Sequence, residues 1–173
     1  MSDISDASAD DAIAAARAET RAAFENRAIL YRLIFEEIAA EVGRERAAEI
    51  MKRAIRRRGE QTSVKYREAA EAGDLRLVGC IFCGDSACDG ALFEPSIESW
   101  DGETLVLSME ACPLVDAWKA AGLPDTEIDL MCDIAAAIDT GTFEGAGLEL
   151  TFLDRQGRPG SEKCLLRLRV PGR

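Results

Sequence analysis

Apolar residues recur at steps of three and four through the first part of the chain, a spacing that places them on one face of an α-helix. The helix is expected to begin at Asp10 or Asp11, because acidic side chains stabilise the positive end of a helix. Gly43 is expected to end it as a C-cap. The stripe consists of Phe24, Ala28, Tyr31, Phe35 and Ile38, widened by Leu30 and Ile34.

A second periodic stretch, from about residue 44 to residue 72, predicts a second helix with Gly59 as a candidate interruption. The two helices are expected to pack against each other as an antiparallel pair. The alternative is a homodimer that forms through the N-terminal helices and uses the excess apolar surface of the first one. The inward positions of the second helix are Ala47, Ile50, Met51, Ala54 and Ile55.

From Leu75 onward the spacing of apolar residues changes. In several short segments they alternate with polar residues, which predicts strands. Asp101-Gly102 is a strong signal for a two-residue hairpin, and a second hairpin is expected to turn near Gln156-Gly157. Two short helices are expected at residues 113–121 and 125–139. The expected strands are 75–78, 92–100, 104–109, 148–154 and 163–170.

This order of elements predicts an α+β fold, with N-terminal amphipathic helices packed on an antiparallel sheet of hairpins and two short helices inserted between the hairpins. Residues 1–8 are expected to be disordered. Residues 9–173 are long enough to form one domain with its own core. Its helical part is expected at 9–72, and the sheet with the short helices at 75–173.

The formal net charge of −11 argues against nucleic acid as a partner, because nucleic-acid binding requires a basic face. The one basic run, at residues 52–58, is interpreted as a solvated helix face, with a phosphate-binding patch as the alternative. No apolar stretch approaches the length of a membrane span, and the acidic N-terminus does not resemble a signal peptide. We therefore expect a cytoplasmic protein whose six cysteines are thiols or metal ligands rather than disulfides.

The sequence contains no histidine, which excludes a Ser-His-Asp triad or a Cys-His dyad within this chain. Cysteines and aspartates must therefore carry much of any acid–base or nucleophilic chemistry. Cys112 precedes Pro113 at the expected start of a helix, where unpaired N–H groups and the helix dipole should lower the pKa of its thiol. The alternative is a buried structural cysteine.

Cys132 and Asp133 lie on the next expected helix, and Cys132 shares one stripe with Ala136 and Asp139. Carboxylates beside a thiol could bind a cation, or one of them could act as a general base. The alternative is a solvated acidic face beside a core cysteine. Trp118 is interpreted as a core residue, with the wall of a pocket as the second interpretation.

Cys80 and Cys83 form a CxxC motif in a segment rich in turn residues, and Cys88 follows shortly after. This spacing favours a zinc ion or an iron–sulfur cluster, for which Cys112 or Cys132 could supply a fourth ligand. A redox-active dithiol and unliganded cysteines are the two alternatives.

Three stretches together resemble the L-2-amino-thiazoline-4-carboxylic acid hydrolase family: RAILYRLIFEEIAAEVGRERAAEIMKRAIRRRGE, CPLVDAWKAAGLPDTEIDLMCDIAAAID and EKCLLRLRV. The resemblance runs from about residue 27 to the C-terminus. It implies a hydrolase that opens a cyclic amidine, or a thiazoline-type carboxylic acid, at a C–N bond. The positions that match the family pattern are Cys112, Cys132, Asp133, Asp139 and Cys164.

We therefore expect a small-molecule substrate, catalysis by Cys112, Cys132, Asp133 and Asp139, and substrate contacts from Trp118 and Cys164. The Cys80–Cys88 cluster is not part of the family pattern and favours a metal-binding or redox variant over simple hydrolysis. The alternative function is a cysteine-ligated metal domain or a sensor domain that binds a small ligand. A likeness in architecture to the vinyl-reductase-type domains favours the ligand-binding alternative.

Overall fold

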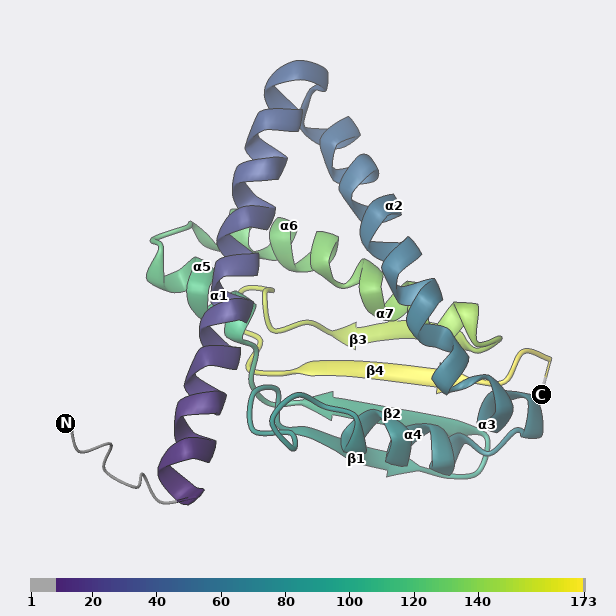
Figure 1. The fold of residues 1–173 in the computed structure, drawn as a ribbon. Helices are drawn as coiled ribbons and strands as arrows, with labels where there is room; N and C mark the ends of the chain where they lie inside the picture. Colours follow the sequence, from purple (N-terminus) through teal and green to yellow (C-terminus); the bar gives the residue numbers. More distant parts are fainter. Residues whose placement is uncertain (1–8, 173) are drawn as a thin grey trace.

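Four antiparallel strands form one sheet in the computed structural model, which describes residues 9–172 (Figure 1). Long helices precede the sheet, and shorter helices lie before and between its two hairpins. The expected α+β fold is therefore confirmed. The segment 1–8, for which disorder was expected, lies outside the described residues.

The two N-terminal helices form an open V whose apex is Gly43 (Figure 1). Helix α1 (Ala9–Val42) and helix α2 (Arg44–Thr62) are separated by this one glycine, whose φ of 83° favours a residue without a Cβ. The end of α1 is therefore where the sequence places it. Within residues 9–172, no helix combines the length and the apolar character that a bilayer span requires.

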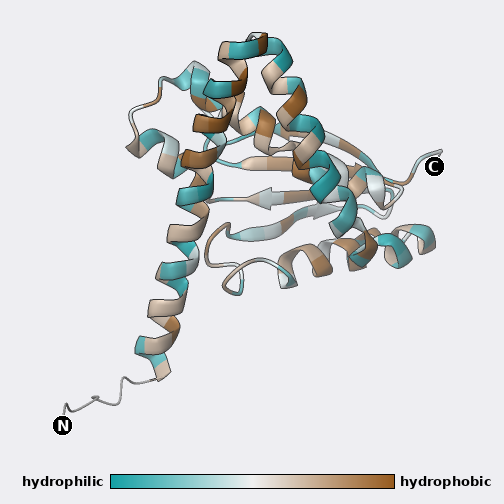
Figure 2. Cartoon of the chain, turned by 45° about the horizontal axis from the view of Figure 1, so that its top comes forward, coloured by the Kyte–Doolittle hydropathy of each residue, from teal (hydrophilic) through white to brown (hydrophobic). Residues whose placement is uncertain are grey.

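The face of α1 toward the protein is narrower than its sequence suggests. Ala28 and Phe35 are buried, whereas Leu30 and Ile34 each expose 47% of their surface. Residues 9–19 are exposed around the whole helix, and Figure 2 shows this part of α1 extending away from the sheet. The homodimer through the N-terminal helices stays a prediction.

The expected strand at 75–78 is wrong, because this segment begins a helix. After the 3₁₀ turn η1 (Ser63–Lys65) and helix α3 (Arg67–Ala72), helix α4 (Leu75–Gly84) starts at a cap in which Leu77 N–H donates to Asp74 Oδ1 at 2.9 Å. This cap satisfies a backbone donor that a strand would have paired differently. Leu75 and Val78, three positions apart, are both buried, as on one face of a helix.

The sheet has the strand order β1-β2-β4-β3. Strand β1 (Pro95–Trp100) begins later than expected, at its proline, and pairs with β2 (Thr104–Met109) across the Asp101-Gly102 turn. Strand β3 (Glu149–Asp154) pairs with β4 (Cys164–Arg169), and β4 also pairs with β2, so the two hairpins join through their inner strands. Both expected hairpins are confirmed.

The helices between the hairpins differ from the expected pair. Helix α5 (Pro113–Ala120) forms as expected, but the second helix is divided into α6 (Asp125–Ala135) and α7 (Ala137–Gly145), which extends beyond residue 139. At the junction Asp139 N–H donates to the carbonyl of Ala136 at 3.1 Å, a tighter turn than an α-helical one. The break between α6 and α7 therefore lies at Ala136, three residues before Asp139.

Two hydrophobic clusters form the core, one between the helices and one against the sheet. The first joins α1, α2, α5 and α6, with Trp118 fully buried and its indole N–H donating to the carbonyl of Ala28 at 2.9 Å. The second lies between α3, α4, α7 and the inner face of the sheet, and its buried side chains include Leu75, Leu105, Phe143, Leu166 and Leu168. Helices α6 and α7 connect the two clusters.

Helices α2 and α7 cross at two glycines. A Cβ on Gly59 would lie 2.1 Å from the carbonyl oxygen of Ile138, and a Cβ on Gly141 would lie 2.1 Å from that of Arg56. The sequence suggested Gly59 as a candidate interruption, but α2 continues through it to Thr62. Gly59 allows the backbones of the two helices to touch, which fixes the position of α7 against α2.

Candidate active site

Three of the cysteines come from different elements and meet between the two core clusters. Cys112 is the N-cap of α5 with Pro113 after it, as predicted, Cys132 is on α6, and Cys164 begins β4. Cys164 pairs in the sheet with Met109, which is three residues before Cys112. Each of these thiols is free. Cys132 raises the pKa of Cys112, and Cys132 and Cys112 both raise the pKa of Cys164.

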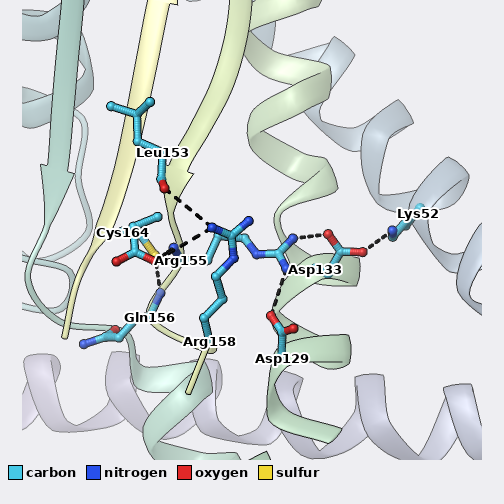
Figure 3. Close-up of polar contacts among 9 residues, drawn as sticks. Lys52, Asp129, Asp133, Leu153, Arg155, Gln156, Arg158 and Cys164 are labelled. Atoms are coloured by element: carbon cyan, nitrogen blue, oxygen red, sulfur yellow. Dashed lines mark hydrogen bonds and ion pairs between the residues drawn. The ribbon is translucent and has the colours of Figure 1, made fainter. Parts of the chain in front are cut away.

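The connection between β3 and β4 covers this cysteine cluster. Gln156 N–H donates to the sulfur of Cys164 at 3.3 Å, as Figure 3 shows, and the backbone N–H of Gly157 acts on the thiol of Cys132. A Cβ on Gly157 would lie 2.3 Å from the Cβ of Cys132, so only glycine fits at this position. Consecutive backbone donors thus face two of the three sulfurs.

Burial controls the acidity of the cysteines. It raises the pKa of Cys112 to about 11, although the N–H groups of Val115 and Leu114 act in the opposite direction. Burial likewise raises the pKa of Cys164 to about 12, and it raises the pKa of Cys132. The expectation that the start of α5 makes Cys112 acidic is therefore wrong, because desolvation of the thiolate outweighs the helix terminus.

Asp139 is a carboxyl group whose pKa suits a catalytic base. Burial raises its pKa to about 7, and its charge raises the pKa values of Cys132 and Cys164. Its side chain has no hydrogen-bond partner within residues 9–172, yet the residue retains some accessible surface. A carboxyl group that exchanges its proton near neutral pH can act as a general acid or base.

Asp133 belongs to an ion-pair network that bridges α2, α6 and the β3–β4 connection (Figure 3). It contacts both Lys52 and the buried Arg155, and Arg155 also contacts Asp129 at 2.8 Å. Burial opposes the ionisation of Asp133, but the two cations outweigh it and lower its pKa. These contacts favour the ionised form of Asp133, and its catalytic role stays a prediction.

A cavity of about 450 Å³ opens beside this network, between α2, the α6–α7 junction and β3. Its volume falls within the range of small-molecule sites. Part of the basic run at residues 52–58 lines this cavity. The arginines of the run are exposed, which agrees with its interpretation as a solvated helix face. The cavity is lined by Glu49, Lys52, Arg53, Arg56, Asp133, Ala136, Ala137, Thr140 and Phe152.

The other predicted site residues lie elsewhere. Trp118 is enclosed in the first core cluster, which agrees with its interpretation as a core residue. Cys80 and Cys83 are on helix α4, not in the expected loop, and Cys88 follows in a turn at a positive φ. Within the described part of the chain, no three Cys, Asp or Glu side chains are gathered as a metal site requires.

Several residues around the cysteine cluster have no signal in the sequence that marks them as part of a site. Arg155, Gln156 and Gly157 read as an ordinary hairpin connection, although Gln156-Gly157 correctly marks the turn. Lys52 is visible only as a member of the basic run. Arg155 and Lys52 reach the site through contacts with Asp133 across 22 and 81 positions of sequence.

Comparison with known proteins agrees with the resemblance in the sequence. The sequence model of the L-2-amino-thiazoline-4-carboxylic acid hydrolase family matches residues 21–167, which is most of the chain. The match includes the three clustered cysteines, Asp133 and Asp139. The comparison with curated proteins finds no match.

Proposed function

Because the chain belongs to the L-2-amino-thiazoline-4-carboxylic acid hydrolase family, we propose that it hydrolyses a small thiazoline-type carboxylic acid at the C–N unit of its cyclic amidine. Membership of this family makes the protein a hydrolase with a small-molecule substrate. The proposal assigns the chemistry to the region where Asp139 lies close to Cys132 and Cys164.

The proposal rests mainly on the raised pKa of the Asp139 carboxyl group. A carboxyl group with a pKa of about 7 is divided between its acid and its base form at physiological pH. General bases work best when their pKa is near the working pH. Asp139 also lacks a hydrogen-bond partner within residues 9–172, so its oxygens are available to a water molecule.

In the proposed reaction, water is the nucleophile. Its oxygen forms a bond to the amidine carbon, Asp139 accepts the released proton, and the electron pair of the C=N bond moves onto nitrogen. Asp139 passes this proton to the ring nitrogen that received the electron pair. It then takes the proton of the new hydroxyl group and delivers it to the same nitrogen, the C–N bond to that nitrogen breaks, and a carbonyl remains at the former amidine carbon. One water is consumed, and no oxidant or reductant is required.

The cysteines line the site as thiols in this reaction. With pKa values of about 11 for Cys112 and about 12 for Cys164, both remain protonated at neutral pH. A thiol is a far weaker nucleophile than a thiolate. Direct attack by water is therefore favoured over a covalent intermediate on Cys112.

The test uses 2-amino-thiazoline-4-carboxylate as substrate and mass spectrometry to detect a product that has gained one water. The rate should rise with pH through a pKa near that of Asp139. Asp139→Asn should lower kcat by roughly 10²–10⁴-fold, the range for loss of a general base. Asp125→Asn, at an exposed carboxylate on α6, serves as the matched control and should keep the activity.

Two further results would contradict the assignment. A stable adduct of substrate on Cys132 or Cys112, together with complete loss of turnover in the corresponding alanine variant, would make the thiol the nucleophile. Full activity of Asp139→Asn with an unchanged pH profile would remove Asp139 from the chemistry. Circular dichroism of each variant shows whether the fold is intact.

A further inference from the structure

The cavity beside α2 gathers positive charge in a chain that is strongly acidic. Lys52, Arg53 and Arg56 all line it, although the net charge of the whole chain is −11. Glu49, on the same wall, pairs with Arg46 at 2.6 Å. The cationic wall is therefore a local feature of this cavity and not a property of the whole surface.

The cations of the wall differ in how firmly they are held. Arg56 pairs with Glu144 at 2.8 Å and also contacts Glu60. Arg53 has no hydrogen bond or ion pair with any residue from 9 to 172. Its guanidinium is exposed at the cavity and can therefore bind an anion without breaking an existing contact.

Lys52 can also bind an anion at a low cost in free energy. Its partner, Asp133, is held by a second cation, Arg155, which pairs with Asp129 as well. If Lys52 leaves, Asp133 keeps Arg155 and does not become an unpaired carboxylate in a half-buried place. The network thus permits Lys52 to exchange Asp133 for a ligand.

The opposite wall suits a small ring. Ala136 and Ala137 leave space, and Phe152 adds an apolar surface from β3. Asp139 lies within one helical turn of both Ala136 and Thr140, which line the cavity. A ring bound here has its anionic end at α2 and its other end near α7.

We propose that this cavity is the subsite for the carboxylate of the substrate, with Arg53 and Lys52 as the residues that select an acidic ring over a neutral one. The inference rests on the proposed function, which it deepens by naming the recognition group. Asp133 stays ionised through Arg155 and faces the amidine nitrogens, which carry N–H donors. The subsite thereby holds the ring beside the α6–α7 junction, within one helical turn of Asp139.

Binding can be measured apart from catalysis with a ring that water does not open. The probe is thiazole-4-carboxylate, with thiazole as the neutral comparison, titrated by calorimetry into the intact protein. The wild type should bind the acid and not thiazole. Arg53→Gln should weaken binding of the acid at least about tenfold, the loss expected for one charge-assisted contact.

Matched variants separate this effect from a general change of charge. Arg57→Gln removes the same charge from an exposed position of α2 that does not line the cavity, and it should leave binding unchanged. Arg53→Lys should restore part of the affinity. Equal binding of the acid by wild type, Arg53→Gln and the Lys52→Gln, Arg53→Gln double variant would overturn the subsite.

The subsite and the proposed reaction can fail separately. Binding of thiazole-4-carboxylate that depends on Arg53, without hydrolysis of 2-amino-thiazoline-4-carboxylate, would leave the subsite and refute the reaction. Hydrolysis with the same KM in wild type and Arg53→Gln would leave the reaction and refute the subsite.

Discussion

Replacing Gly141 with alanine tests the contact that holds α7 against α2. The new Cβ would lie 2.1 Å from the carbonyl oxygen of Arg56, 2.9 Å from its carbonyl carbon and 3.0 Å from the backbone nitrogen of Glu60. These atoms belong to the backbone of a helix, so no side chain can rotate away. The two helices must separate by about 1 Å to restore ordinary van der Waals distances.

The expected loss of stability follows from two opposing effects. Overpacking of a close contact costs about 1–3 kcal/mol, and the upper end applies here because the clash is with backbone. Alanine in place of glycine favours the helix by about 1 kcal/mol. The net loss is therefore about 2 kcal/mol, which for a chain of this size lowers Tm by about 4–8 °C.

Urea and thermal unfolding followed by circular dichroism measure this loss. The control is Gly84→Ala, because Gly84 ends α4 and a Cβ there meets no atom within 4 Å. Gly84→Ala should be neutral or stabilising by up to about 1 kcal/mol. If Gly141→Ala is as stable as the wild type while Gly84→Ala behaves as expected, the close crossing of α2 and α7 is refuted.

Two further predictions follow from the buried titratable groups. Iodoacetamide at neutral pH should modify the exposed Cys80 before Cys112 and Cys164, because pKa values of about 11 and about 12 keep the latter two as thiols. Mass spectrometry assigns the order of labelling, and faster labelling of Cys112 than of Cys80 would contradict this. Because burial raises the pKa of Asp139 from 3.8 to about 7, the folded state binds its proton more tightly, so this residue's contribution to stability should fall as pH rises from about 4 to about 7. Urea unfolding of wild type and Asp139→Asn should show that decrease only in the wild type, and parallel curves would refute it.

The sequence predicts those parts of the fold that depend on local pattern. The stripe around Phe35, the turn at Asp101-Gly102 and the Pro113 helix start all act over a few residues, and all three appear in the structure. The sequence pattern predicts a strand at residues 75–78, and this is wrong, because four residues of mixed polarity fit a strand and a helix equally well. The cap at Asp74 decides between them.

The candidate site is harder to predict because it depends on contacts between distant segments. Nothing near Asp133 indicates that Lys52 and Arg155 will pair with it. The acidity of Cys112 was predicted from its helix terminus, a local effect, whereas the burial that outweighs it comes from the packing of whole elements. Sequence patterns thus identify the cysteines and aspartates as candidates, and only the fold determines their protonation states.

Because the first turns of α1 are exposed, its backbone amides should differ in their protection from hydrogen exchange, although they belong to one continuous helix. With 34 residues, α1 is about 51 Å long at 1.5 Å per residue. An isolated helix the length of residues 9–19 is marginal in water, so these turns open without the rest of the protein unfolding. Near Ala28 and Phe35, opening requires the first core cluster to separate. Amide hydrogens of α1 should therefore exchange with solvent progressively more slowly from its N-terminus toward Phe35, and the helix unravels from one end while its middle stays closed.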